Sequence, residues 1–585
     1  GFANDDLAVL VPLLGIDGEK RFFSATDEVE VRDLLREFLG NPPVPLIGHN
    51  AGQYDRLNIE ASLGITPKLA ADTLLLHLLA DNEMPHNLGF VGSYYTDFTE
   101  AWKADHTAVH ARSDLDLHLY CATDCCVTAR VVPGVMRDVK RRKQVHLIER
   151  EHMLQKAAVG MQKLGLRVDW DKVNENEIAF EARVLENKRV CKEITGSTFN
   201  PLSFKQLGNL LYKEWGIAPE RYSEKTGAPS TDDDSLRTIY TKHELRPEQK
   251  HLIHSVRMIR RYSKLLSTYI RPLSGRYALE DGRVHPSYNR LPATGRFSSS
   301  APNAQNVPGF LREMFIPEEG HVFVGADMDQ IELRLLAEES KAKLLLKTIH
   351  EGLDPHNENM EIVYGKSVWG LAGAPEDRRM KGKGVFKATR GVTKCVFYAW
   401  QYAASIPTIH QQVVSVEDED GKLIYAHLGH RDIRDVVQGL GKALPEVPEW
   451  WETQRRLFRK QGYLDDSLWH RRRDFRDKEK LNELVNHPIQ SAASAIVHEA
   501  TLELLYGVKG WSTEGSEFEG LLPFDYEART GLVNQCHDSL VFEVMEDDAE
   551  ETVKKLEAAM NRRRLINPLL TYTAEADIGV HWGEV

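Results

Sequence analysis

The sequence predicts a multidomain protein that combines α/β and α+β domains. Its 585 residues, of which 42% are hydrophobic, are enough for several domains with separate cores. Short apolar runs such as Val322–Val324 alternate with longer helical patterns such as Arg390–Tyr402. Two aspartates far apart in the chain, Asp327 and Asp538, each stand where a strand pattern ends. These observations indicate a central sheet to which distant parts of the chain contribute.

The segment around Asp327 reads as a strand followed by a helix. Val322–Val324 has the pattern of a short buried strand, and Ile331–Ala337 follows a helical pattern with polar residues interleaved. Asp327 is therefore expected at the C-terminal end of the strand. A lone aspartate at such a place is most often a turn or cap residue, so this position alone indicates no chemistry.

The segment around Asp538 predicts a β-hairpin. Two β-rich runs, Leu532-Val533 and Leu540–Phe542, flank a polar interruption that contains His537 and Asp538. Two carboxylates brought together from distant strands would suit a pair of divalent ions about 3.5–4 Å apart, which stabilise the attacking and leaving oxygens of a displacement. Mg²⁺ takes only one or two protein carboxylates together with substrate phosphates. The pair therefore points to phosphoryl transfer on a triphosphate.

A basic and aromatic helix face is predicted between these two aspartates. Side chains that recur at every fourth position share one face, because four residues advance a helix by about 40° beyond a full turn: Arg390, Lys394, Tyr398 and Tyr402. Two cations suit phosphates, and two rings suit a base or a sugar. The alternative is a solvated basic helix with aromatic residues in the core. A separate apolar stripe of Val392, Val396 and Phe397 favours a ligand for the first face.

These segments resemble the motifs of the family A DNA polymerases, the group of DNA polymerase I and its phage and mitochondrial relatives. The run Asp327–Arg334 resembles motif A, the Arg390 helix resembles motif B, and His537-Asp538 resembles motif C. Three further stretches are similar to blocks of that family: Thr294–Pro308, Asn486–Ala493 and Lys264–Leu273. The resemblance covers about residues 145–585 and implies a right-hand polymerase with thumb, palm and fingers.

The resemblance implies a role for each matching residue near the two aspartates. Asp327, Asp538 and the backbone carbonyl of Met328 would hold two Mg²⁺ ions, for which Mn²⁺ would substitute. The incoming nucleotide would be bound by Gln330, Glu332, His356, Arg390, Lys394, Tyr398 and Tyr402. Among these, Arg390, Lys394 and His356 would contact the phosphates and stabilise the charge that develops on the transferring group, so that Asp327, Asp538, Arg390 and Lys394 form the catalytic set.

Two further roles implied by the resemblance concern the nucleotide sugar. Glu332 would close the space of a ribose 2′-OH and bond to Tyr402, which predicts DNA rather than RNA as the product. The hydroxyl of Tyr398 would replace the contact that a missing 3′-OH leaves unmade, which predicts ready use of dideoxynucleotides.

The resemblance also implies a set of DNA contacts. Primer-template DNA would be bound by Arg296, Asn303, Gln305, Asn486, Gln490 and His537 in its minor groove, with Lys264 and Thr268 on the thumb. Minor-groove acceptors look alike in all correct pairs, so donors there check pair shape without reading sequence. Taken singly, these are equally well read as loop and cap residues. Three positions depart from the family pattern, namely Asp329, Ala399 and Ser539.

The N-terminal part resembles a proofreading exonuclease domain, an RNase H-like α/β unit. Leu46–Asp55 is similar to the second exonuclease motif and Tyr120–Asp124 to the third, with Asp72-Thr73 between them. This implies an exonuclease remnant of Asn50, Asp55, Tyr120 and Asp124. The first motif is not found: Asp5 and Asp6 are better read as turn residues, and Leu7–Leu14 looks like the second strand. The chain looks truncated ahead of that motif, and we expect little proofreading from it.

The motifs predict a domain order along the chain. We expect an exonuclease-like domain at 1–140, the thumb at 141–285, the first palm segment at 286–345, the fingers at 346–479 and the second palm segment at 480–585. Within the fingers, Val416–Lys422 is expected to form a surface hairpin that interrupts the helical pattern.

Composition limits the partners and the cellular setting that can be expected. The net charge of −13 is unfavourable for a DNA partner, but local charge matters more than the sum. Basic runs occur at Arg257–Lys264, Arg378–Lys383 and Arg471–Arg473. Such runs are also common on plain solvated faces. Six cysteines show no zinc spacing or secreted disulfide pattern, and no membrane or signal segment is apparent, so an intracellular protein is expected.

Together these features predict a template-directed DNA polymerase that adds deoxynucleotides to a primer 3′ end, in replication or repair. Its expected partners are primer-template DNA, deoxynucleoside triphosphates and an unidentified processivity factor, with no membrane. The alternatives are a 3′–5′ exonuclease, a single-subunit RNA polymerase and a noncatalytic DNA-holding module. Glu332 argues against the RNA polymerase, and the Arg390 and Lys394 pair against the module.

Overall fold

The computed structural model describes residues 13–14, 20–21, 28–98, 114–196, 199–223, 226–275, 280–418, 421–476, 479–508, 521–563 and 569–585. Several predictions fall outside these residues, namely those for Asp5 and Asp6, for most of Leu7–Leu14, and for Glu419 and Asp420 at the tip of the expected hairpin. The names palm, thumb and fingers are used below for the segments to which the sequence assigns them.

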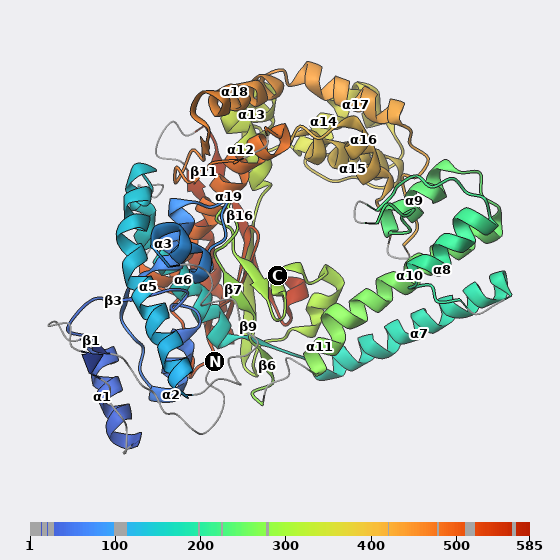
Figure 1. The fold of residues 1–585 in the computed structure, drawn as a ribbon. Helices are drawn as coiled ribbons and strands as arrows, with labels where there is room; N and C mark the ends of the chain where they lie inside the picture. The colour runs from blue at the N-terminus through green and yellow to red at the C-terminus, as the bar shows by residue number, and fades with distance from the viewer. Residues whose placement is uncertain are drawn as a thin grey trace.

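The palm is built on a four-stranded antiparallel sheet in the order β12-β13-β9-β16 (Figure 1). Its strands are β9 (His321–Met328), β12 (Gly531–Cys536), β13 (Ser539–Met545) and β16 (Ala574–Gly579). The predicted strand and hairpin are confirmed, and β9 is longer than its apolar run. In the register Ser539 lies opposite Asp327, so the strand end and the hairpin turn meet. The sheet thereby joins segments more than two hundred residues apart in the chain.

Both faces of β9 are covered, which explains why its residues from Val322 to Ala326 are all buried rather than alternating. Helices α19 (Leu481–Tyr506), α20 (Ala549–Met560) and α6 (Ile148–Leu164) pack against strands of the sheet. On β9, a Cβ at Gly325 would lie 2.7 Å from the side chain of Val585, so only glycine allows the C-terminus to approach.

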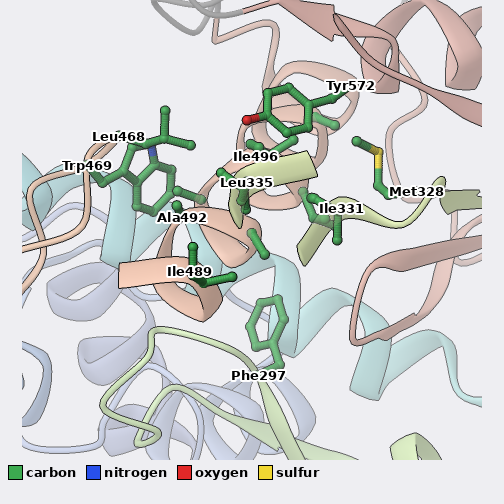
Figure 2. Packing of buried hydrophobic residues seen from close by; sticks show 14 of the residues in the cluster. Phe297, Met328, Ile331, Leu335, Leu468, Trp469, Ile489, Ala492, Ile496 and Tyr572 are labelled. Atoms are coloured by element: carbon green, nitrogen blue, oxygen red, sulfur yellow. The ribbon is translucent and has the colours of Figure 1, made fainter. Parts of the chain in front are cut away.

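The main core continues from the sheet into α12 (Ile331–Ser340), the helix that follows Asp327 (Figure 2). Ile331 and Leu335 of α12 face Ile489, Ala492 and Ile496 of α19. Burying an aliphatic side chain of this size contributes roughly 1.5–3 kcal/mol. The packing fixes the first turn of α12, and with it the side chain of Glu332.

Short strands and helices tie the palm to its neighbours. β5 (Leu166–Arg167) pairs with β6 (Arg283–Val284), and β7 (Ser287–Asn289) pairs with β8 (Ser298–Ser300). The remaining short elements are β14 (Arg562–Arg563), β15 (Thr571–Tyr572), η6 (Ala304–Asn306), η7 (Gly309–Met314), η9 (Glu546–Asp548) and η10 (Trp582–Glu584). A second core cluster under these elements includes Phe315 and Trp582, whose rings are 5.6 Å apart.

The thumb is a pair of long helices, α7 (Trp170–Thr195) and α10 (Pro247–Leu265), which project from the palm together (Figure 1). At its C-terminal end α10 passes directly into the π-helix η5 (Leu266–Ile270). The outer end carries α8 (Phe204–Gly208), η4 (Asn209–Glu214) and α9 (Asp233–Lys242), and the inner end carries α11 (Arg271–Ser274). Leu211, Leu236 and Ile253 belong to the separate core of the outer end.

The fingers are mainly helical and lie at the other end of the palm (Figure 1). Their elements are α13 (Lys343–His350), α14 (Pro355–Tyr364), η8 (Lys366–Gly370), α15 (Gly384–Trp400), α16 (Ile406–Val414), α17 (His430–Ala443), α18 (Glu446–Gln461), β10 (Leu464–Asp465) and β11 (Arg472–Arg473). Helix α15 contains the predicted basic and aromatic pattern, but it ends before Tyr402. The backbone turns there, where Ala403 has a positive φ of 53° and its N–H donates to Trp400 O.

The N-terminal segment combines helices with short strand pairs. It contains β1 (Leu13–Leu14), β2 (Lys20–Arg21), α1 (Glu28–Gly40), β3 (Leu46–Gly48), α2 (Asp55–Leu63), β4 (Leu69–Asp72), α3 (Thr73–Ala80), α4 (Leu88–Tyr95), α5 (Asp114–Arg141) and η3 (Val145–Leu147). β3 and β4 are parallel and are flanked by helices, an α/β arrangement. The described residues contain no larger sheet in this segment, so the RNase H-like assignment stays a prediction.

Helix α6 is the first helix of the predicted thumb, but its main contacts are not with α7 or α10. It packs against the palm strands β7 and β12 and against α19. The boundary expected at residue 141 stays untested, although the helical arm of the thumb begins only at Trp170. Even the longest helices of the described ranges lack an apolar stretch able to cross a membrane.

Candidate active site

Asp327 and Asp538 lie side by side at one end of the palm sheet. Asp327 is the seventh residue of β9, and Asp538 follows His537 in the two-residue turn between β12 and β13. His537 accepts the left-handed conformation that this turn needs, with a φ of 56°. The N–H of Met328 donates to the backbone carbonyl of Asp538 at 3.3 Å, which holds the turn against the strand.

The two carboxyl groups repel each other. Partial burial, the charge of Asp538 and a hydrogen bond shared with it raise the pKa of Asp327 to about 7. The pKa of Asp538 is raised as well, first by burial. The raised pKa values show that nearby positive charge compensates this pair of acids only in part. The pair is therefore a place where cations would bind in exchange for protons.

Two arginines already act on this pair, Arg312 on Asp327 and Arg296 on Asp538. Arg312, on the 3₁₀-helix η7, lowers the pKa of Asp327 through its charge and stacks over the Trp582 ring at 4.8 Å. The sequence interpretation missed Arg312, because a single arginine in a short irregular segment carries no periodic signal. Its place is set by the second core cluster, which contains Trp582.

Glu332 is held on two sides. Arg296 donates from Nη2 to Glu332 Oε1 at 2.6 Å, and the Tyr402 hydroxyl donates to Glu332 Oε2. The hydrogen bond between Glu332 and Tyr402 was inferred from the resemblance, and it is present although Tyr402 lies beyond the end of α15. Arg296, expected to reach the DNA, instead directs its guanidinium to this carboxylate. Gln490 of α19 also bonds to the Tyr402 side chain.

Arg390 is buried and paired within the protein. It donates from Nε to Asn357 Oδ1 at 3.0 Å and from Nη2 to Asp354 Oδ2 at 2.5 Å. Asp354 also caps α14 by accepting from the N–H groups of His356 and Asn357. The pattern of every fourth residue located Arg390, but it carried no information on these partners. A phosphate would have to replace or join the Asp354 carboxylate as the partner of Arg390.

Lys394, His356 and Tyr398 form the other side of the same face. Lys394 is exposed, and its ammonium lies 5.7 Å from the Tyr398 ring centre. The His356 ring lies 5.3 Å from that ring, and burial first, then Arg390 and Lys394, keep the pKa of His356 at about 4. The histidine is therefore neutral near pH 7. Its buried Nδ1 has no protein partner among the described residues.

The residues expected at DNA fall into two groups. Gln305 is buried, and its amide donates to Gln535 O at 2.8 Å, while Asn303 accepts from the Ser299 hydroxyl. The more open positions are Asn486, Gln490 and His537 on the palm and Lys264 and Thr268 on the thumb. Gln330 adopts the left-handed region at a φ of 45° where it precedes α12, and its buried side-chain oxygen has no protein partner among the described residues.

Two departures from the family pattern have clear local roles. Asp329 accepts from the Thr573 hydroxyl at 2.8 Å, and its carboxylate is 4.0 Å from Arg334. Ser539 donates to Cys536 O at 2.9 Å and closes the hairpin turn. Asp329 and Ser539 therefore stabilise the strand ends that carry Asp327 and Asp538. Ala399, the third departure, is simply buried in α15.

Three of the N-terminal motif residues, Asn50, Asp55 and Asp124, lie in one region of the structure. Asp55 and Asp124 both act on the thiol of Cys125, whose pKa is raised chiefly by burial. Burial and Asp72 raise the pKa of Asp55. Asp72 itself accepts from the N–H groups of Asn50 and Gly52. Tyr120 lies on α5 with Asp124, and the described residues hold no group of three or more His, Cys, Asp or Glu side chains suited to a metal.

The arrangement of strand, hairpin and helix matches a known family. A model of DNA polymerase family A matches residues 171–584. The chain belongs to this family. Its members generally use divalent metals. The match begins near the start of α7, so the N-terminal segment lies outside it.

Relatives of this family A chain are DNA polymerases I of bacteria. The chain is 25% identical to DNA polymerase I of Synechocystis over 593 aligned positions, which cover 95% of this chain and 55% of that protein. It is 28% identical to the thermostable DNA polymerase I of Thermus filiformis over 453 positions, 74% of this chain and 48% of that protein. The chain thus spans about half the length of these relatives.

A solved structure supports the fold assignment. The polymerase domain of Pol1 from M. smegmatis, solved in complex with DNA primer-template and dNTP, superposes with a TM-score of 0.75 at 21% identity. The superposition covers 97% of this chain and 92% of that one. The expected right-hand polymerase fold is confirmed by this likeness and by the family match.

Proposed function

We propose that this chain is a template-directed DNA polymerase that adds deoxynucleotides to the 3′ end of a primer. The observation that carries the proposal is the contact between Asp327 and Asp538 at the sheet end, with the pKa of Asp327 raised to about 7. Family A membership supports the reaction class. The bacterial relatives, named as DNA polymerases I, support it too.

Asp327 and Asp538 fit a divalent metal pair. Two adjacent carboxyl groups that share a proton would each be relieved by a cation, and the backbone carbonyl of Met328 is the further donor at this strand end. Mg²⁺, or Mn²⁺ in its place, would supply activation of the primer hydroxyl and stabilisation of the leaving pyrophosphate. The protein's part is to hold one carboxylate on β9 and the other in the adjacent hairpin turn, which the left-handed His537 and the Ser539 hydrogen bond support.

The triphosphate would lie along the cationic face of α15. Lys394 is exposed and ready to bind a phosphate, whereas Arg390 is occupied by Asp354. His356, neutral and with a free Nδ1 among the described residues, would accept or donate a hydrogen bond without adding charge. Charge-assisted contacts from Arg390 and Lys394 would stabilise the charge that develops on the phosphoryl group. Gln330 would lie near the same phosphates.

The sugar would be selected by a rigid carboxylate. Arg296 and Tyr402 fix Glu332 from two sides, so its side chain has little freedom to move away from a ribose 2′-OH. A held side chain excludes a hydroxyl more strongly than a mobile one, since its displacement breaks two hydrogen bonds. Deoxynucleotides are therefore the proposed substrates.

Primer-template DNA is the proposed partner. The partly open polar side chains of Asn486, Gln490 and His537 would lie near the primer end, and Lys264 and Thr268, exposed on the thumb, would reach the DNA backbone. Buried Gln305 and paired Asn303 would shape the surface rather than reach into the groove. A processivity factor is a further proposed partner, and DNA replication or repair is the proposed role.

Primer extension tests the function. A labelled primer on a defined template is incubated with Mg²⁺ and either deoxynucleotides or ribonucleotides, using wild type, Asp538→Ala and the control Asp547→Asn, an exposed carboxylate of η9. Wild type and the control should extend with deoxynucleotides only, and Asp538→Ala should lose at least about 10³-fold in rate if one metal is lost. Glu332→Ala should admit ribonucleotides. Absence of extension by wild type that still binds primed DNA would contradict the proposal.

A further inference from the structure

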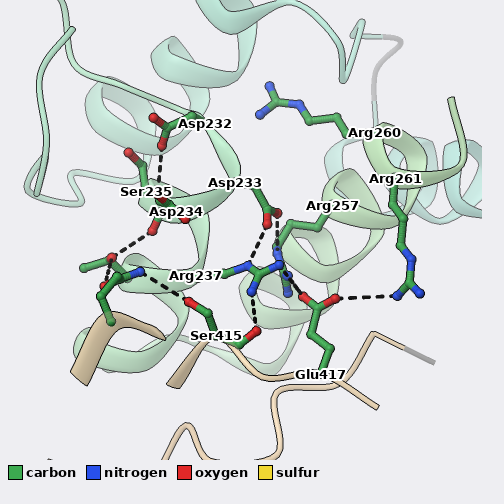
Figure 3. A network of polar contacts seen from close by, with 12 residues as sticks. Asp232, Asp233, Asp234, Ser235, Arg237, Arg257, Arg260, Arg261, Ser415 and Glu417 are labelled. Carbon is green, nitrogen blue, oxygen red and sulfur yellow. Dashed lines mark hydrogen bonds and ion pairs between the residues drawn. The ribbon is translucent and has the colours of Figure 1, made fainter. Parts of the chain in front are cut away.

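The outer end of the thumb touches the fingers through a dense set of ion pairs (Figure 3). Glu417, in the hairpin that follows α16, is bonded to Arg257 and lies 3.0 Å from Arg237 and 3.5 Å from Arg261. Arg237 also donates to Ser415 O, and the Thr238 hydroxyl donates to Gln411 Oε1 at 3.4 Å. We call this contact the thumb–fingers seam. It consists of Arg237, Thr238, Arg257 and Arg261 on one side and Gln411, Ser415 and Glu417 on the other.

The charges of the seam depend on Glu417. The thumb side brings three arginines together with one carboxylate, Asp233, which lies 2.6 Å from Arg237 and 2.8 Å from Arg257. Arg257 is only 3% exposed and Glu417 15%, so their charges are largely removed from water. Among the described residues, withdrawing Glu417 would leave Asp233 as the one negative partner of the three guanidinium groups, which is unfavourable for buried charges. The hairpin is thus matched to the thumb in charge as well as in position.

The hairpin that carries Glu417 is fixed to the fingers and shaped to reach the thumb. Ile424 donates to Val416 O, and Asp418 and Lys422 bond to each other across the turn. The Tyr425 hydroxyl donates to Ala388 O of α15 at 3.2 Å. On the thumb side, a Cβ at Gly421 would lie 2.3 Å from Met258 of α10, so the hairpin backbone approaches that helix closely.

We propose that the seam closes the palm, fingers and thumb into a ring that keeps primer-template DNA bound. The inference rests on the proposed polymerase function, because it takes DNA to lie on the palm between the two arms. The chain connects thumb to palm and palm to fingers, and the seam makes the third connection (Figure 1). DNA inside such a ring leaves by sliding off an end or by opening of the seam. The seam is small and polar, so it is suited to open for loading.

The first test needs no DNA. Hydrogen exchange is measured by mass spectrometry for residues 411–418 and for α9 in wild type, Glu417→Ala and Asp418→Asn. Asp418→Asn is the matched control, since it removes one charge from the same exposed turn and keeps an acceptor for the Lys422 N–H. Exchange in both regions should rise about ten-fold in Glu417→Ala, the size expected when close charge pairs across an interface are lost. The control should match wild type.

The second test uses the topology of DNA. Dissociation into a heparin trap is measured from a primed closed circle and from a short linear duplex of the same sequence. Wild type should leave the circle about ten-fold more slowly than the linear duplex, and Glu417→Ala should abolish that difference. Addition of a single nucleotide at saturating DNA should be unchanged in Glu417→Ala. Glu417→Ala and Arg261→Ala should be non-additive in the dissociation rate, because the two residues share one ion pair.

The outcomes separate the ring from the polymerase function. Equal exchange in Glu417→Ala and wild type would overturn the seam as a closing contact. Raised exchange with an unchanged ratio between circle and linear DNA would overturn retention by the ring. If wild type neither binds primed DNA nor extends it, both the polymerase proposal and the retention of DNA by the ring are overturned. The hydrogen-exchange result would still decide whether the seam holds the thumb and the fingers together.

Discussion

At the scale of single residues, the site is controlled by groups whose charges are only partly compensated. Asp327 and Asp538 lack a full cationic partner, while Arg390 has a carboxylate partner that a substrate would have to displace. The two aspartates therefore favour cations as ligands, and Arg390 favours a triphosphate. Each predicts a measurable effect of one substitution.

Asp327→Asn should stabilise the metal-free protein at pH 8. The pKa of Asp327 is about 7 in the folded protein against 3.8 for the free group, so the folded state binds the proton more tightly. Its contribution to stability is present at low pH and is lost as the pH rises through 7. Asparagine carries no charge, so Asp327→Asn avoids this loss of stability. After allowance for solvent screening we expect the free energy of unfolding to rise by about 1 kcal/mol at pH 8.

Urea unfolding in EDTA between pH 5 and pH 8 checks this prediction. The gain should shrink toward pH 5, where Asp327 is protonated in the folded protein. Asp547→Asn serves as the control, because Asp547 is exposed in η9, at the opposite end of β13 from Asp538. A gain that does not depend on pH would contradict the assignment of the raised pKa to Asp327.

Tyr398→Phe should reduce the use of dideoxynucleotides. The Tyr398 hydroxyl lies in the field of Glu332 and Asp538, close to where a nucleotide sugar would bind, and it would replace the bond of a missing 3′-OH. Loss of one such hydrogen bond corresponds to about a ten-fold lower ratio of dideoxynucleotide to deoxynucleotide incorporation. Single-nucleotide incorporation measures the ratio. Equally poor dideoxynucleotide use by both proteins would count against the role of Tyr398.

At the scale of elements, the local patterns predicted the strand at Asp327, the hairpin at Asp538 and most of the basic helix. Each of these depends on neighbours within a few residues, which a sequence pattern records. Other contacts join distant parts of the chain. Arg390 is paired with residues of α14, Glu332 with Arg296, and Glu417 with arginines of the thumb. Charge and periodicity do not encode such pairings, since many arginines and glutamates have equivalent patterns. The backbone turn before Tyr402 was missed because nothing in its sequence excludes a continuing helix.

Asp354 should couple α14 to α15. It caps α14 and holds Arg390 at 2.5 Å, so Asp354→Ala removes a cap, worth about 1 kcal/mol, and leaves a buried guanidinium with less compensation. We expect a total loss of about 3 kcal/mol. Asp354→Asn keeps a capping oxygen and should lose about 2 kcal/mol. Denaturant titration measures both values, and equal losses for the two variants would show that the ion pair alone matters and the cap contributes nothing.

At the scale of the whole molecule, a chain of net charge −13 is proposed to hold a polyanion. Binding then depends on local cations and on release of counterions from the DNA rather than on net charge. The acidic excess would limit nonspecific binding elsewhere on the surface. The salt dependence of DNA binding is therefore a direct measure of which cations take part.

Lys264→Ala should reduce the salt dependence of DNA binding. If this exposed thumb lysine contacts one phosphate, its loss lowers the slope of log K against log salt by about one. Fluorescence anisotropy of a primed duplex at several salt concentrations gives the slope. Lys554→Ala is the control, because Lys554 is exposed on α20 and belongs to no predicted DNA contact. Equal slopes for both variants would remove Lys264 from the DNA contacts.

The order of strands in the palm has a consequence for synthesis of the chain. β9 is an inner strand, and both of its partners, β13 and β16, are translated more than two hundred residues later. On the ribosome β9 therefore waits with both hydrogen-bonding edges unpaired while the fingers are made, and such edges are prone to pair with other chains. Contacts so distant in sequence also slow folding. The fingers should complete their own packing first, and Asp327 should meet Asp538 only as the last quarter of the chain emerges.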